Sequence, residues 1–196
     1  MLEEAVRKIK GEEEKPAHAG TSINLGISVR IDSSYIPEEN QRLRMYKRIA
    51  AAEDQATLAD VRAELQDRYG NPPESVLNLL AAGELRLKCE QLGIAQLDRK
   101  RTQVEFPNPA NKKQPIKQFV EMLHLRFAVP DSTTSADLAH AQIDPGQLMK
   151  LVSRNTKRGA QFTPQGILRW PLTSAKAEVV LAETRALLDS LEPAAM

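Results

Sequence analysis

Tyr35-Ile36-Pro37-Glu38-Glu39-Asn40 begins the stretch that decides the fold of this chain, and Glu64-Leu65-Gln66-Asp67-Arg68-Tyr69-Gly70 ends it. Pro37 and the two carboxylates after it are typical of a helix start, because proline lacks only a donor that is unused there and acids favour the positive end of a helix. Gly70, with two prolines soon after it, is typical of a helix end. The stretch therefore predicts two successive amphipathic helices, at about 38–52 and 56–70.

The residues on either side of this pair predict a strand before it and a buried helix after it. From Ile23 to Ile31, apolar residues alternate with smaller or polar ones, which is the period of a half-buried strand. Residues 73–92 would carry apolar side chains on nearly every side of a helix. We therefore expect this third helix to be central and buried.

Beyond Gly93 the sequence predicts short strands. Ile94–Leu97 and Thr102–Phe106 fit a β-hairpin whose turn is the polar segment Asp98–Arg101. Residues 107–140 are broken by prolines and a Ser/Thr cluster, although Met122–Phe127 within them could add a strand.

The last third of the chain predicts a helix, a second hairpin and a closing helix. These are a helix from Pro145 to near Asn155 capped by Asp144, a hairpin of Ala160–Thr163 and Gly166–Trp170, and a helix at about 174–191 capped by Thr173 or Ser174. The whole pattern predicts an α+β domain in which helices pack against short antiparallel strands and hairpins.

The first 20 residues differ from the rest of the chain. Residues 2–10 can form a short charged helix, and the charged and small residues up to Gly20 are typical of a solvated linker. We therefore divide the chain into a leader at 1–20 and a domain at 21–192. The charged start does not resemble a signal peptide and no run is apolar enough to span a membrane, so we expect no membrane partner and a cytoplasmic location.

Several short blocks resemble, in order and spacing, the C-terminal (TRCF) domain of bacterial transcription-repair coupling factors, Mfd. The blocks are Tyr35-Ile36-Pro37, Arg42-Leu43-x-x-Tyr46-Lys47-Arg48-Ile49, Glu64-Leu65-x-Asp67-Arg68-Tyr69-Gly70, Leu92-Gly93-Ile94, Ile143-Asp144-Pro145 and Gln161-Phe162-Thr163-Pro164-x-Gly166. The resemblance covers roughly residues 20–192. It implies that the leader is the end of the preceding motor portion and that 107–140 is an insertion relative to the family's shorter connection.

The sequence shows no motif for catalysis, a metal or a cofactor. It lacks the glycine-rich phosphate cradle of a nucleotide-hydrolysing motor, and its three histidines are not spaced to share one metal. The single cysteine, Cys89, lies among leucines of the third helix and is expected to pack rather than react. A third alternative is an enzyme whose active-site pocket the sequence does not reveal, but no motif supports it. We therefore expect a non-catalytic domain without a cofactor.

Three carboxylates are expected to form an exposed stripe on the second helix. Helical spacing places Asp60, Glu64 and Asp67 on the face opposite the apolar positions. The ordinary interpretation is a solvated surface on which Glu64 pairs with Arg68 one turn later.

The family resemblance gives this acidic stripe a second interpretation. In the family, acidic residues of this helix meet arginines on an N-terminal module similar to UvrB, and the matching positions here are Glu64 and Asp67. The resemblance thus implies an autoinhibitory domain that masks UvrA recruitment and restrains DNA translocation in transcription-coupled DNA repair. Its partner would be the UvrB-like module, in the same polypeptide or in trans, with UvrA, RNA polymerase and DNA reached only through the rest of the protein.

The basic residues suggest an alternative, a small nucleic-acid-binding module. Arg99, Lys100 and Arg101 would form a basic turn that could contact phosphate. Against this, the formal net charge is only +1 and aromatic residues, which stack on bases, make up 4% of the chain.

Overall fold

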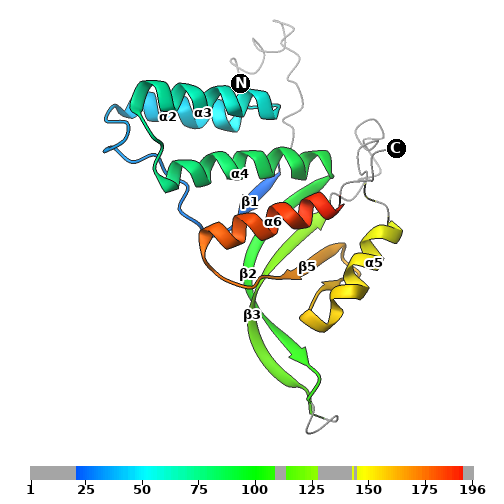
Figure 1. Cartoon of the computed structure of the whole chain (residues 1–196). Coiled ribbons are helices and arrows are strands. Elements are labelled where there is room, and N and C mark those ends of the chain that lie inside the picture. The colour runs from blue at the N-terminus through cyan, green and yellow to red at the C-terminus, as the bar shows by residue number, and fades with distance from the viewer. Residues whose placement is uncertain (1–20, 109–113, 128–142, 144, 192–196) are drawn as a thin grey trace, which may run out of the picture.

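The computed structural model of the chain describes residues 21–108, 114–127, 143 and 145–191, and its elements are shown in Figure 1. In chain order they are β1 (Ser22–Asn24), α2 (Glu39–Ala50), α3 (Gln55–Tyr69), α4 (Glu74–Gln91), β2 (Ile94–Phe106), β3 (Ile116–Phe127), α5 (Pro145–Asn155), the 3-10 turn η1 (Thr156–Arg158), β4 (Gln161–Phe162), β5 (Ile167–Pro171) and α6 (Ala177–Leu191). The predicted α+β class is confirmed.

Within the described residues, five strands form one mixed sheet in the order β1-β2-β3-β5-β4. β1 runs parallel to β2, and every other neighbouring pair is antiparallel. Leu97, Leu125 and Leu168 lie side by side on the three central strands and are all fully buried. They form one core with apolar residues of α4, α5 and α6, so these helices cover one face of the sheet.

The helices α2 and α3 form a further layer, which contacts the rest of the domain through α4 (Figure 1). A second core, which includes Met45, Ile49 and Leu65, fills the space between these helices. α4 contributes Val76 and Leu80 to this core and other residues to the core beneath the sheet. The prediction of a central, buried third helix is therefore confirmed.

The predicted strand at 23–31 is much shorter than expected, because only Ser22–Asn24 pair in the sheet. Gly26 has φ +60°, a left-handed conformation that interrupts an extended strand. The inward alternation nevertheless continues to Leu25, which joins the sheet core, while Ile31 joins the α2–α3 core. The segment thus crosses between two cores, which the alternation alone did not reveal.

The predicted hairpin at 94–106 is wrong, because these residues form the single strand β2. The polar residues expected in its turn continue the strand, since their side chains find partners within the fold. Arg99 donates to the carbonyl oxygen of Ala175 at 3.0 Å, and Asp98 accepts from Gln96 at 2.7 Å. β2 pairs instead with β3, which includes the further strand expected at Met122–Phe127.

The C-terminal elements agree with the sequence analysis, except at one helix start. α5 and the β4–β5 hairpin are confirmed, whereas α6 begins at Ala177 rather than near 174. Thr173 bonds to Glu183 and Ser174 accepts from the backbone of Lys176, so both predicted caps lie ahead of the helix. The predicted leader helix and the Asp144 cap lie outside the described residues. The insertion at 107–140 stays a prediction, and its residues 116–127 form β3.

Candidate functional site

The helix α3, which carries the predicted acidic stripe, is fixed at both ends. At its start the Asp54 carboxylate accepts from the backbone N–H of Thr57 at 2.7 Å, and this bond lowers the pKa of Asp54. At its end Gly70 has φ +81°, and its carbonyl accepts from the Tyr35 hydroxyl at 2.9 Å. The backbone that carries the stripe is therefore fixed both by its own N-terminal cap and by a hydrogen bond from Tyr35, which lies outside the helix.

The inward face of α3 agrees with the prediction. Leu58, Val61 and Leu65 are buried, and Tyr69 is half-buried against the ring of Tyr35. Burial of this face directs the opposite side of the helix to solvent. Asp60 and Asp67 are exposed there, and neither makes an ion pair within the described part of the chain.

Glu64 differs from the prediction, which placed it on the same exposed stripe. Its carboxylate is half-buried between two arginines, with Arg48 of α2 on one oxygen and Arg68 Nη1 at 2.9 Å from the other. Glu64 lies on the side of α3 that faces α2, so its carboxylate joins the two helices. The free acidic surface is therefore the pair Asp60 and Asp67, which we call the acidic pair.

The two arginines also determine the charge of Glu64. Hydrogen bonds from Arg48, and then from Arg68, lower the pKa of the carboxyl group, against a smaller effect of burial that raises it. Arg68 in turn has a raised pKa because it bonds to Glu64. The group is thus a stable ion bridge rather than a proton donor or acceptor.

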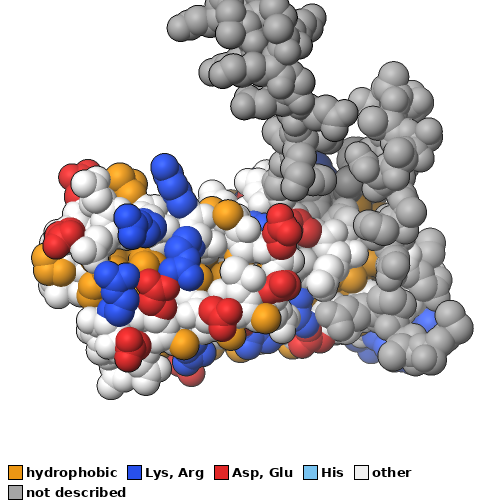
Figure 2. Space-filling model, turned by 90° about the horizontal axis from the view of Figure 1, so that it is seen from above, with side chains coloured by type: hydrophobic (Ala, Val, Ile, Leu, Met, Phe, Trp, Pro, Cys, Tyr) orange, Lys and Arg blue, Asp and Glu red, His pale blue; other side chains and the backbone are white. Residues whose placement is uncertain are grey.

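The surface around the acidic pair mixes both signs of charge. In Figure 2, basic side chains gather in a row over the α2–α3 layer, with acidic side chains beside them. Arg44 and Lys47 of α2 are exposed and contribute to this pattern. A partner surface that is purely cationic would therefore meet attraction from α3 and repulsion from α2, which favours a defined orientation.

The predicted basic turn does not exist as a patch. In the strand β2, Lys100 points to one face of the sheet, and Arg99 and Arg101 point to the opposite face. Arg99 is held by Gly26, Ala175 and Glu121, and Arg101 lies 5.3 Å from the centre of the Phe119 ring. Figure 1 places this strand and α2 on opposite sides of α4.

Sequence analysis missed one polar pocket, on the face of the sheet that faces away from α4 and α6. It is lined by Gln96, Asp98, Lys100, His124, Arg126 and Ile167, and we call it the sheet pocket. The alternation of Gln96, Asp98 and Lys100 could have indicated a polar strand face, but the polar run suggested a turn instead.

The remaining predicted features have ordinary positions. Cys89 is fully buried in the sheet core, and burial raises the pKa of its thiol to about 12, which confirms a packing role. Among the described residues, no three His, Cys, Asp or Glu side chains are grouped so that they could hold a metal ion. Over the same residues, no helix is long and apolar enough to cross a membrane.

Comparison with known proteins identifies the domain type. The family model described as the TRCF domain matches residues 25–130. A transcription-repair-coupling factor of Haemophilus influenzae is 38% identical over 102 residues, which are 50% of this chain and 9% of that protein. The Escherichia coli transcription-repair-coupling factor is 28% identical over 162 residues, which are 81% of this chain and 13% of that protein.

A solved structure is similar in fold. The crystal structure of a C-terminal domain of transcription-repair coupling factor matches with a TM-score of 0.59 and 17% identity, covering 88% of this chain and 94% of that chain. At this identity the match establishes the fold alone. The matched part of this chain spans 9–13% of the length of the two relatives above.

Proposed function

The chain belongs to the TRCF domain family, and on that basis we propose that it is a non-catalytic, autoinhibitory domain of transcription-coupled DNA repair. Its partner is the UvrB-like module of a coupling factor, in the same polypeptide or in trans. Docking masks the surface that recruits UvrA and restrains translocation on DNA. RNA polymerase and DNA are contacted by other parts of the coupling factor.

The observation that carries this proposal is the exposed acidic pair on a rigid helix. Asp60 and Asp67 lie two turns apart on the outer side of α3, and neither makes an ion pair with the described residues, although Arg68 lies near enough to Asp67 to interact with its charge. Carboxylates held on a fixed scaffold can accept paired hydrogen bonds from arginine, which supply orientation and selectivity. This character suits a contact that must be specific and still releasable.

Glu64 has a different role in this proposal from the one that the resemblance implied. Both of its oxygens are occupied by Arg48 and Arg68, so an arginine of the partner must displace one of them or bind beside the bridge. We therefore assign Glu64 to positioning α3 on α2, and the acidic pair to the contact itself.

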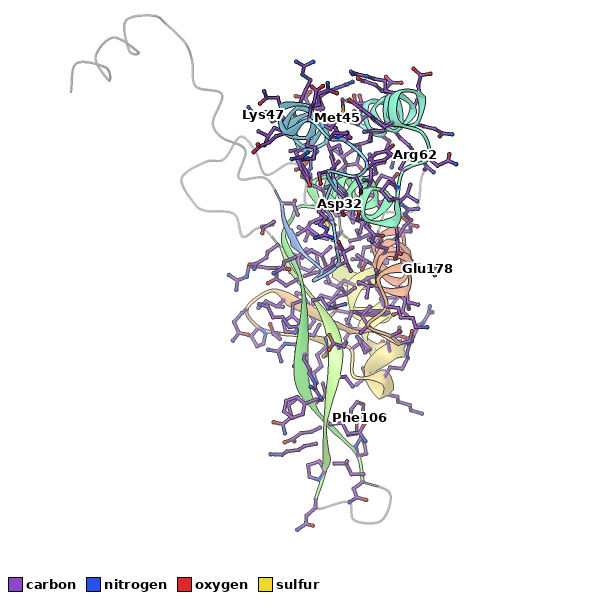
Figure 3. All side chains as sticks on the ribbon, turned by 90° about the vertical axis from the view of Figure 1, so that its left-hand side faces the viewer. Asp32, Met45, Lys47, Arg62, Phe106 and Glu178 are labelled. Carbon is purple, nitrogen blue, oxygen red and sulfur yellow. The ribbon has the colours of Figure 1, made fainter. Side chains whose placement is uncertain are left out.

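The test is a binding titration between the purified chain and the UvrB-like module, with Asp60→Arg and Asp67→Arg as the test variants. Each reversal is expected to weaken binding by about tenfold or more, which corresponds to roughly 1.4 kcal/mol. Glu178→Arg is the matched control, because Glu178 is also exposed on a helix but lies on α6, away from α3 (Figure 3). Wild-type affinity in both test variants would show that the acidic pair is not the docking surface.

A further inference from the structure

The face of the sheet that α4 and α6 leave open carries a group of charged side chains around one histidine. Paired residues of neighbouring strands share a face, so Asp98, His124 and Arg169 form one row. Lys100 and Arg126 lie on the same face in the adjacent rows. Leu97 and Leu125, which alternate with these residues along the strands, point to the other face and into the core beneath the helices.

The charges in this region are unbalanced towards positive. Asp98 is the one carboxylate in the sheet pocket, and it is already bound by Lys100 Nζ at 2.9 Å and by Gln96 Nε2 at 2.7 Å. Arg126 is exposed at the pocket and makes no ion pair with the described residues. Arg169 carries a buried Nε without a partner in that same part of the chain. Two guanidinium groups therefore lack a counter-charge here.

His124 lies at the centre of this group and responds to its charges. Its Nε2 lies 2.9 Å from the Thr102 hydroxyl. The pKa of His124 is lowered by burial, and then by Arg169 and Lys100, against a smaller opposing effect of Asp98. Arg126 is the remaining charged group that lines the pocket. A bound anion beside His124 would oppose the effect of these cations on its pKa.

We propose that the sheet pocket binds a phosphate group, with Arg126 as its main ligand, Lys100 and Arg169 supplying the positive surroundings, and His124 lying beside them. The guanidinium group can donate two parallel hydrogen bonds to a pair of phosphate oxygens. The group can come from a free phosphate compound or from a nucleic-acid backbone, since the chemistry is the same. This site is separate from the acidic pair on α3 and does not depend on the docking proposal.

The first measurement follows His124 by NMR while sodium sulfate is added, with sodium chloride at equal ionic strength as the reference. Sulfate is a stable probe for phosphate, because its charge does not change over about pH 5–8, where histidine titrates. We expect saturable shifts of the His124 ring and a higher pKa for His124. Equal responses to sulfate and chloride would overturn the proposal.

Two variants should then change sulfate affinity in opposite directions. Arg126→Gln is expected to weaken sulfate binding by about fivefold or more, because it removes the main ligand. Asp98→Asn should tighten binding, because it keeps the shape of the side chain but removes the one carboxylate. Arg62→Gln is the matched control, since Arg62 is an exposed arginine on α3, far from the sheet (Figure 3). Unchanged affinity in both test variants would place the sulfate elsewhere.

A third arm identifies the source of the phosphate. A short DNA duplex is titrated against the sulfate-loaded and sulfate-free protein. Displacement of sulfate by DNA, with loss of DNA binding in Arg126→Gln, would assign the site to a nucleic-acid backbone. Sulfate binding that DNA does not displace would assign it to a small phosphate compound.

Discussion

Replacing Glu64 by glutamine is expected to destabilise the domain, because this carboxylate joins α2 to α3. The variant keeps the size of the side chain but loses the charge that both Arg48 and Arg68 contact. The side chains of Arg48 and Glu64 are 40% and 28% exposed, so solvent screens their pair. At that exposure an ion pair contributes about 0.5–1 kcal/mol to the free energy of unfolding.

The measurement is urea unfolding of four proteins, wild type, Arg48→Met, Glu64→Gln and the double variant. The coupling free energy between the two positions isolates the Arg48–Glu64 pair and should be about 0.5–1 kcal/mol. Each kcal/mol corresponds to a shift of about 2–4 °C in Tm for a domain of this size. Because salt screens partly exposed charges, the coupling should shrink in about 1 M NaCl, where the Debye length is about 3 Å.

A pH series gives an independent test of the same bridge. The folded state lowers the pKa of Glu64, so its stabilising effect is present above the ordinary pKa of glutamate and is lost as the pH falls through the lower, folded value. The wild type should therefore lose its advantage over Glu64→Gln in acid. Asp67→Asn is the control and should leave stability unchanged. Zero coupling at low salt, or a larger loss of stability in Asp67→Asn than in Glu64→Gln, would refute the assignment of Glu64 to a structural role.

Three further predictions concern the sheet and its core. Leu125→Ala should lower the free energy of unfolding by about 2–5 kcal/mol in urea, because Leu125 is fully buried on the central strand β3. A loss below 1 kcal/mol would mean that the core is loosely packed there. Cys89 should not react with a thiol reagent at pH 8 until the protein unfolds, because its thiol is buried and its pKa is raised to about 12. Rapid labelling of the folded protein would contradict this placement. Stability should fall as the pH drops below the ordinary histidine value of 6.5, because folding lowers the pKa of His124 and the unfolded chain binds that proton first. His124→Gln should weaken this pH dependence, and an unchanged profile would assign it to other groups.

The helical half of the fold could be predicted because its signals are local. The apolar spacing of Leu58, Val61 and Leu65 fixes which side of α3 is buried, and Gly70 marks where that helix ends. The structure confirms the three helices between residues 39 and 91 within a few positions. In each case, information within one or two turns of the chain was sufficient.

The sheet could be predicted only in part, because strand pairing depends on residues far apart in the sequence. The polar run Asp98–Arg101 is typical of a turn when it is considered alone. It forms a strand because Glu121 and His124 of β3, together with Gly26 and Ala175, surround it. The same long-range pairing creates the sheet pocket, so the pocket was hidden for the same physical reason.

The acidic site, too, could be predicted only in part from the sequence. Spacing along α3 predicted that Asp60 and Asp67 are exposed, since this depends only on the position of the apolar face. Spacing could not show that Arg48, on a different helix, binds Glu64. The structure therefore divides the predicted stripe into an exposed acidic pair and an internal bridge.

The position of α4 determines how the domain responds to force and to unfolding. This helix supplies side chains to both cores, so neither layer keeps its packing if α4 detaches. Gly83 lets α4 approach α2 and α3 closely, since a Cβ atom at this position would lie 3.3 Å from side-chain atoms of Ile49 and Leu58. The domain should consequently melt in a single cooperative transition. A force applied to α2 and α3 would be transmitted through α4 to the sheet, because α4 packs in both cores.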